Sequence, residues 1–481
     1  MKTTYKLGPV VALALLAGAC DEGLTDLNKN PNAPEAVTPQ LLFPQGTVAA
    51  VTLFRGSDFD MTFTSLWAQH IAKIQYTEED RYAIRVDAIN GWFRNAYSGP
   101  LQDFRATIDQ AEVLKQPALT GPPLVMKSWT FGAMTDTWGD IPYSEANRGT
   151  DPEIIITPKY DAQKDIYAGI LSDLTKANQV LTGVTTVYAG ADPIYAGNAG
   201  RWQKFANSLR MRYAMRMSKA DPAAARTAFI AANSAGPMSS VADDAKLTWT
   251  GDVRANENPI FNNNRTRDDH RVSETTVNTL KGLNDPRLAV YAQKAVDTGD
   301  YAGVPNGLTS SVATGLGLTK TSKIGTFFSS MTSPSYLMNY SEVLFLRAEA
   351  VEKGWIPGSA ATFYNDGIRA AMQTVGVPTA AIDAYLAQPA VQYKGGAAGL
   401  TQIYLQKWIS LFGQGVEAWA EYRRTGQPPL ALAKSPVAGV TSIPRRLTYP
   451  TTEFTFNEAN VNAAVAAMGG DQLSTRVWWD K

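Results

Sequence analysis

Apolar side chains recur at three- and four-residue steps in two neighbouring stretches of the C-terminal half of the chain. The first covers residues 340–351 and stops at the turn-forming sequence Gly-Trp-Ile-Pro-Gly of residues 354–358. The second covers residues 360–375, and Ser359 stands directly before it in the position of an N-cap. The spacing predicts two amphipathic helices, and the short turn predicts that they pack as an antiparallel hairpin of the tetratricopeptide kind.

The same periodicity predicts further helices. Residues 160–181 and 202–217 form a second candidate pair. Residues 403–425 carry apolar side chains at helical spacing and stop at the Gly-Gln-Pro-Pro of residues 426–429, so we predict one long helix there.

Two long segments between these helices lack a clear period. Residues 222–300 and 301–334 are rich in Gly, Asn and Ser, which predicts long irregular loops. The sequence contains no repeat of fixed length and no composition shift that would mark a linker. We therefore predict a mostly α fold: a single large helical domain with tetratricopeptide-like hairpins and long irregular loops.

The first residues are typical of an exported, lipid-anchored protein. Lys2 and Lys6 precede a short apolar run over residues 7–16, and the only cysteine of the chain, Cys20, follows small residues. This pattern predicts a lipoprotein signal peptide over 1–19, a lipidated tether over 20–36 and a folded domain over 37–481. The alternative is an ordinary signal peptide followed by a buried free cysteine.

Composition excludes one class of partner and favours another kind of site. The 44 Lys and Arg balance the 44 Asp and Glu, and no long basic run is present, which argues against nucleic acid as a partner. The chain carries 11 Trp, 20 Tyr and 17 Phe. Most of these rings are expected in the core, and the remainder are available for a ligand.

The usual enzyme motifs are missing from the sequence. The two histidines, His70 and His270, are far apart, and there is no HExxH, GxSxG, P-loop or GxGxxG motif, so we predict neither an enzyme nor a cofactor. A glycosidase that uses two carboxylates stays open as an alternative. The alternation of Asp26, Asn28, Asn30 and Asn32 resembles the start of a calcium loop. The glycine and the glutamate that such a loop needs are replaced by Pro31 and Val37, so we predict no metal site.

A series of motifs resembles the SusD/RagB family of nutrient-binding outer-membrane lipoproteins of Bacteroidetes. The resemblance begins with Leu-Thr-Asp-Leu-Asn-Lys-Asn-Pro-Asn at 24–32 and Trp-Gly-Asp-Ile-Pro-Tyr-Ser-Glu-Ala at 138–146. It continues with Tyr-Ser-Glu-Val-Leu-Phe-Leu-Arg-Ala-Glu-Ala at 340–350 and Tyr-Arg-Arg-Thr-Gly at 422–426. The C-terminal part of the pattern is Ile-Pro-Arg-Arg-Leu-Thr-Tyr-Pro at 443–450 and Val-Trp-Trp-Asp at 477–480.

The resemblance implies a function at the cell surface. Members of that family are anchored by lipid to the outer face of the outer membrane. There they bind a glycan or an oligopeptide and act as a lid on a SusC-type, TonB-dependent β-barrel transporter. Asp21 and Glu22 resemble the acidic surface-export signal of these bacteria, although a solvated acidic tether is an alternative. A surface scaffold without its own ligand is the other alternative.

The hallmark charges of 340–350 and 422–426 are expected to be structural. Glu342, Arg347 and Glu349 are spaced to pair along one helix, and Glu421 can pair with Arg424. If such pairs are partly buried, they fix the register of a hairpin more than they stabilise it.

The ligand site is predicted from the chemistry of sugars. Their C–H faces pack on exposed aromatic rings, and their hydroxyl groups need amide, carboxylate or guanidinium partners. A first set lies in a predicted loop that also looks like the family's ligand-facing loop: Trp67, Gln75, Tyr76, Arg81, Tyr82 and Trp92. A second set lies in the irregular middle of the chain: Asn263, Arg265 and Tyr336. The alternative is that the rings of these sets fill the core.

Overall fold

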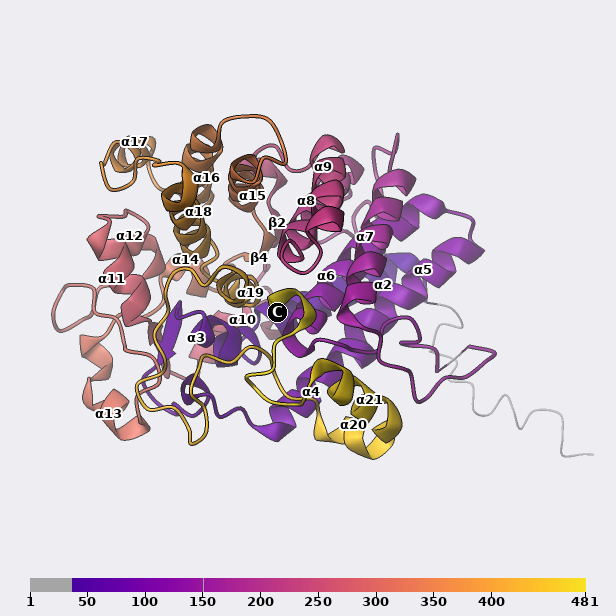
Figure 1. Cartoon of the computed structure of the whole chain (residues 1–481), viewed down its shortest axis with the longest axis horizontal. Helices are drawn as coiled ribbons and strands as arrows, with labels where there is room; N and C mark the ends of the chain where they lie inside the picture. The colour runs from indigo at the N-terminus through magenta and orange to yellow at the C-terminus, as the bar shows by residue number, and fades with distance from the viewer. Residues whose placement is uncertain (1–36, 150) are drawn as a thin grey trace, which may run out of the picture. The chain divides into compact units, whose positions relative to one another are not determined.

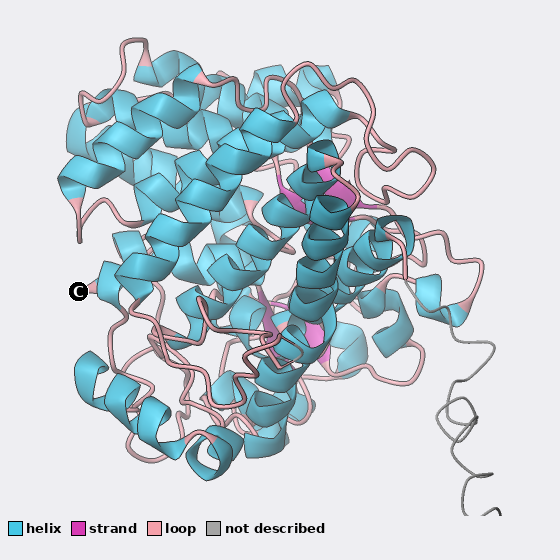
Figure 2. Cartoon of the chain, turned by 90° about the vertical axis from the view of Figure 1, so that its right-hand side faces the viewer, coloured by secondary structure: helices cyan, strands magenta, loops and turns pink. Residues whose placement is uncertain are grey.

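The computed structural model describes residues 37–149 and 151–481, and the part from Pro39 to Lys481 forms one compact unit. That unit is mostly helical, as predicted, and its strands are few and short (Figure 2). Cys20, the calcium-like segment and the family motif at 24–32 lie outside the described residues. Among the described residues, no helix combines the length and the apolar character needed to cross a bilayer.

Helices that follow one another in the sequence pack side by side (Figure 1). The predicted hairpin is confirmed as α15 (Tyr340–Glu352) and α16 (Ala360–Thr374), and the Ser359 hydroxyl accepts the backbone N–H of Thr362 at 3.2 Å as the predicted N-cap. The second pair is α7 (Gln163–Val180) and α8 (Ala199–Arg216). α6 (Gly121–Trp138) packs on α7, and α9 (Pro222–Ser234) packs on α8.

Two sequence predictions need correction. The single helix predicted over 403–425 is two helices, α18 (Gly396–Ser410) and α19 (Gly415–Thr425), because the chain turns at Gly413, whose φ is +78°. The predicted stop is confirmed, since Gly426 caps α19 in the left-handed conformation. Residues 222–234 are helix α9 and not loop. Asp221 caps this helix. The exposed face of α9 is rich in alanine, so the sequence shows no clear alternation of apolar and polar positions at helical spacing.

Four short strands and further helices, from the three residues of α3 to the 17 residues of α2, complete the unit. The strands are β1 (Ile71–Lys73), β2 (Ala245–Leu247), β3 (His270–Val272) and β4 (Ser335–Met338), which form the antiparallel pairs β1–β3 and β2–β4. The other helices are α2 (Pro39–Arg55), α3 (Ser65–Trp67), α4 (Val86–Ala96), α5 (Gln102–Val113), α10 (Pro259–Asn264), α11 (Glu274–Gly282), α12 (Leu288–Tyr291), α13 (Ser310–Gly315), α14 (Thr326–Ser329), α17 (Thr379–Leu386), α20 (Thr451–Phe456) and α21 (Glu458–Met468).

Most aromatic rings lie in one continuous core, as their number predicted. Six tryptophans are almost completely buried: Trp67, Trp138, Trp202, Trp408, Trp419 and Trp479. Several of these rings meet a neighbouring ring edge-on, for example Trp67 and Trp419, whose ring centroids are 5.4 Å apart. These packed rings join helices from both halves of the chain.

A connected set of buried charges runs through the helical core, and we call it the ion ladder. Arg216 on α8 binds Asp136 of α6 and Glu417 of α19. Arg212 continues the ladder to Glu342 of α15 at 2.6 Å. Two further cations complete it: Lys407 on α18 lies 3.0 Å from Glu421, and Arg424 lies 2.5 Å from Glu421 and 2.6 Å from Glu349.

The ion ladder differs from the pairing expected along a single helix. The Glu421–Arg424 pair is confirmed, but Glu342 and Glu349 bind cations on other helices. Arg347 instead donates to the Asn233 side chain of α9 at 2.8 Å. Burial alone would raise the pKa of Glu417, but the guanidinium groups of the ladder outweigh burial and lower this pKa to about 2. The hallmark motifs thus fix how α6, α8, α15, α18 and α19 pack.

Removing one cation of the ion ladder should lower the stability of the protein more than removing a surface cation. Arg424→Met removes the shortest ion pair of the buried Glu349 and one of the two buried cations of Glu421, which keeps Lys407, so we expect the free energy of unfolding to fall by about 3–5 kcal/mol. The matched control is Arg369→Met, which breaks an exposed pair with Asp383 (2.8 Å) and should lower it by about 1 kcal/mol or less. Urea denaturation measures both, and equal losses would contradict a structural role for the ladder.

The two histidines should make stability fall in mild acid. Burial lowers the pKa of His70 to about 3 and that of His270 to about 4. In the unfolded chain both histidines take up a proton near pH 6.5, whereas in the folded protein they stay neutral. Their contribution to the free energy of unfolding is therefore complete above pH 6.5, and it is lost as the pH falls from 6.5 toward the two folded-state pKa values. In denaturation between pH 6.5 and 4.5, His270→Gln should reduce the slope of stability against pH by about 1.4 kcal/mol per unit. An unchanged slope would show that His270 does not titrate differently on folding.

Candidate functional site

The β1–β3 pair places the chain that follows β1 beside the chain that precedes β3. The strands run antiparallel with Lys73 opposite His270, and the backbone N–H of Ile74 donates to the carbonyl of Asp269 at 2.8 Å. The segment that leaves β1 and the segment that enters β3 therefore lie side by side. The first contains Gln75 and Tyr76, and the second contains Asn263 and Arg265.

Tyr76 offers an open aromatic ring at this junction. The residue is 62% exposed, and the Arg267 guanidinium lies over its ring at 5.0 Å from the centroid. Asp269 holds Arg267 through contacts of 2.9 and 3.1 Å and is itself buried. Burial alone would raise the pKa of the Asp269 carboxyl, but the hydrogen bonds from Arg267 outweigh burial and lower this pKa. We call Tyr76, Arg267 and Asp269 the Tyr76 platform.

The backbone also constrains the platform. Tyr76 has a φ of +52°, a left-handed conformation that a tyrosine adopts only when its surroundings hold it. The next residue, Thr77, provides such a hold, because its backbone N–H donates to the Ser310 hydroxyl at 3.1 Å. The ring is thus exposed but its base is fixed, so little conformational entropy remains to be lost when a ligand packs on it.

A polar hollow of about 400 Å³ lies under α10, and we call it the α10 hollow. Asn258 caps α10 by accepting the backbone N–H groups of Ile260 and Phe261 at 2.9 and 3.2 Å. Thr266 lines this hollow, and the next residue is Arg267, so the hollow and the Tyr76 platform share one segment of chain. The wall consists mainly of polar side chains: Thr52, Ser57, Arg254, Glu257, Asn262, Asn263 and Thr266.

Four of the predicted ligand residues lie in the core. Trp67, Tyr82, Trp92 and Tyr336 are between 1% and 6% exposed. The Tyr82 hydroxyl accepts the backbone N–H of Ala433 at 2.9 Å, and the Trp67 ring donates to the carbonyl of Glu79 at 3.2 Å. These rings fill the core, which is the alternative that the sequence left open. They have no free face for a ligand, and we remove them from the candidate set.

The other predicted residues lie at or near the surface. Gln75 is half-buried next to Tyr76, and Asn263 is half-buried in the wall of the α10 hollow. Arg265 is exposed and bound to Glu257 at 2.9 Å. Arg81 donates to the carbonyl of Ser435 at 2.6 Å and so fixes a loop.

Arg267, Asp269 and Thr266 were not among the residues predicted from the sequence. Their role follows from the β1–β3 pairing. Each of these strands has only three residues, which is too short for a period-two alternation to identify the strand in the sequence. The Arg-Asp-Asp sequence of residues 267–269, directly after the asparagine-rich helix α10, is the one local signal that could have pointed to them. In the described ranges, no group of three or more His, Cys, Asp or Glu side chains is placed to hold a metal ion.

Comparison with known proteins identifies the family. The family profile described as "Starch-binding associating with outer membrane" matches residues 31–450. The chain belongs to the SusD-like family. A comparison with curated protein sequences finds no match.

Solved structures of other SusD-like proteins share the fold of the whole unit. A chitin-binding SusD homologue from Flavobacterium johnsoniae is 27% identical with a TM-score of 0.82, over 92% of this chain and 98% of that chain. A SusD homologue from Bacteroides uniformis is also 27% identical with a TM-score of 0.82, over 92% of this chain and 99% of that chain. A homologue from Bacteroides fragilis is 28% identical with a TM-score of 0.77, over 92% and 99% of the two chains. The family predicted from the sequence motifs is therefore confirmed.

Proposed function

We propose that this SusD-like protein captures a glycan at the cell surface and passes it to a SusC-type, TonB-dependent transporter in the outer membrane. In this proposal, Cys20 carries the lipid anchor and the Tyr76 platform together with the α10 hollow receives the glycan. The observation that carries the proposal is an exposed tyrosine ring, held by its backbone, beside a hollow with a mainly polar wall. The family and the solved chitin-binding relative support it.

The platform and the hollow suit the two kinds of surface on a sugar. Arg267 lies over one face of the Tyr76 ring, and the large exposed fraction of Tyr76 leaves area for the C–H face of a pyranose. Asn263 and Thr266 can donate to and accept from hydroxyl or acetamido groups in the adjacent hollow. A peptide could use the same groups, but the aromatic platform beside the amides and hydroxyls of the α10 hollow favours a glycan.

The charged groups of this site are suited to holding a ligand and not to cutting it. Asp269 is bound by Arg267, and Glu257 is bound by Arg265. A general acid or base must exchange a proton near neutral pH, whereas the arginine beside Asp269 keeps that carboxyl ionised. Both histidines are buried. The proposal is therefore binding and delivery without hydrolysis.

Removing the platform ring should weaken glycan binding without unfolding the protein. We expect Tyr76→Ala to raise the Kd for an oligosaccharide, with a chitin hexamer as the first probe, by about tenfold, the value of one aromatic stacking contact. Tyr301→Ala is the matched control, because Tyr301 is a half-buried tyrosine that also carries a cation, Lys294, near its ring at 5.9 Å. Isothermal titration calorimetry measures both affinities.

Two results would contradict the proposal. Equal affinities of wild type and Tyr76→Ala would place the glycan elsewhere. Failure of the wild type to bind any member of a broad panel of oligosaccharides, while it still co-purifies with a transporter, would favour the scaffold alternative.

A further inference from the structure

A second hollow, distinct from the glycan site, lies between α4, α20 and the segments 142–149 and 155–158, and we call it the α4–α20 hollow. Its volume is about 500 Å³, within the range of small-molecule sites. Two of its large apolar side chains are unusually exposed to solvent: Phe456 is 75% exposed and Ile156 is 80% exposed. Apolar side chains clustered around a hollow mark a binding surface more often than scattered ones do. The apolar lining comprises Phe93, Tyr97, Pro142, Ile155, Ile156, Pro158 and Phe456.

The amides in this hollow already have partners within the protein. Asn90 donates to the Thr451 hydroxyl and accepts its backbone N–H, both at 2.9 Å. The side-chain N–H groups of Asn147 and Asn457 each donate to a backbone carbonyl at 2.8 Å. The Tyr97 hydroxyl donates to the carbonyl of Pro142 at 2.6 Å. A sugar in this hollow would give up water around its hydroxyl groups and find few replacements, which disfavours a second glycan site.

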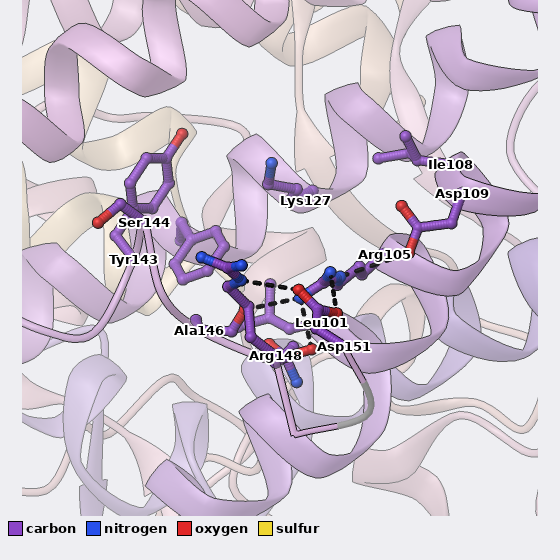
Figure 3. A pocket seen from close by; sticks show the side chains of 12 residues that line it. Leu101, Arg105, Ile108, Asp109, Lys127, Tyr143, Ser144, Ala146, Arg148 and Asp151 are labelled. Carbon is purple, nitrogen blue, oxygen red and sulfur yellow. Dashed lines mark hydrogen bonds and ion pairs between the residues drawn. The ribbon is translucent and has the colours of Figure 1, made fainter. Parts of the chain in front are cut away.

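The cations of the hollow are not fully neutralised. Arg94 is exposed, and within the described ranges it forms no ion pair; its one side-chain contact is a 3.4 Å bond to the Asn95 amide. Arg148 shares Asp151 with Arg105, at 2.7 and 2.6 Å, in a neighbouring hollow (Figure 3). Arg105 is further paired with Asp109 at 3.4 Å, so Arg94 is the guanidinium left for an external anion.

One carboxyl group, Glu453, also lines the hollow and must be considered. It accepts the Tyr160 hydroxyl at 2.7 Å, and burial raises the pKa of this carboxyl. Both effects weaken its repulsion of an anion. The lining therefore combines an apolar floor, satisfied amides and one unpaired guanidinium.

We infer that the α4–α20 hollow binds an apolar carboxylic acid, whose hydrocarbon part packs on Phe456 and Ile156 and whose carboxylate pairs with Arg94. Guanidinium and carboxylate match in geometry and charge. Two sources offer this chemistry: a free aromatic or short-chain fatty acid, and the C-terminal residue of a peptide that ends in an apolar side chain. The hollow shares no lining residue with the α10 hollow, so this binding is independent of glycan capture.

Titration of the full chain, with Cys20→Ser to prevent lipid attachment, tests the inference. The probes are 3-phenylpropanoate, its neutral amide, the peptide Ala-Ala-Phe and the C-terminal amide of that peptide. We expect one saturable site for a carboxylate probe, weakened at least tenfold by Arg94→Gln and by Phe456→Ala. The amides should bind the wild type as weakly as the carboxylates bind Arg94→Gln.

Matched controls separate this site from general effects. Arg226→Gln changes another exposed arginine, and Val113→Ala changes another exposed apolar residue, so neither should alter the affinity. Tighter binding of the peptide than of 3-phenylpropanoate would identify a peptide C-terminus as the ligand, and the reverse order would identify a free acid. No saturable binding of either carboxylate, or binding that is unchanged by both Arg94→Gln and Phe456→Ala, would overturn the inference.

Discussion

The buried ion ladder is the interaction on which the rest of the structure depends. Charges that leave water must be matched closely, because an unpaired charge in the core is strongly destabilising. The ladder alternates acids and bases from α6, α8, α15, α18 and α19, with Arg216 joining Asp136 to Glu417 and Arg424 joining Glu349 to Glu421. Hydrophobic packing alone would tolerate small shifts between these helices. The ladder permits one arrangement, because each shift would leave a charge without its partner.

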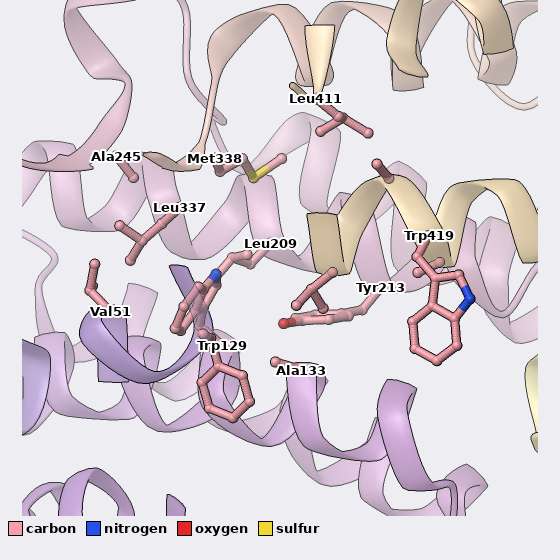
Figure 4. Close-up of a cluster of buried hydrophobic side chains, with 14 of the residues drawn as sticks. Val51, Trp129, Ala133, Leu209, Tyr213, Ala245, Leu337, Met338, Leu411 and Trp419 are labelled. Atoms are coloured by element: carbon pink, nitrogen blue, oxygen red, sulfur yellow. The ribbon is translucent and has the colours of Figure 1, made fainter. Parts of the chain in front are cut away.

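Aromatic packing connects the ion ladder to the loop that carries Tyr76. Trp419 lies on α19 between the ladder residues Glu417 and Glu421, and its ring belongs to the buried hydrophobic cluster (Figure 4). The Trp419 ring also meets Phe63 and Trp67 at 5.7 and 5.4 Å between centroids. Trp67 lies just before β1, and β1 leads directly to Tyr76. The helical body thus positions the loop that carries the Tyr76 platform.

The sequence predicts the helices better than it predicts the site. Helical periodicity located α15 and α16 almost to the residue, because their core-facing positions repeat without interruption. It joined α18 to α19 because both helices keep the same period and only Gly413 marks the turn. The family motifs identified structural charges, which are tied to the fold. The ligand candidates were harder to predict, because the sequence does not distinguish an aromatic residue that is buried, like Trp92 on α4, from one that is exposed, like Tyr76.

Hydrogen exchange measured with and without a bound oligosaccharide tests the central claim most directly, because it reports which backbone segments the ligand protects. If the Tyr76 platform and the α10 hollow receive the glycan, exchange should slow in residues 74–82 and 262–269 and stay unchanged in α7, α8 and the segments 142–149 and 155–158. Protection confined to any other surface, at a concentration that saturates binding, would contradict the account.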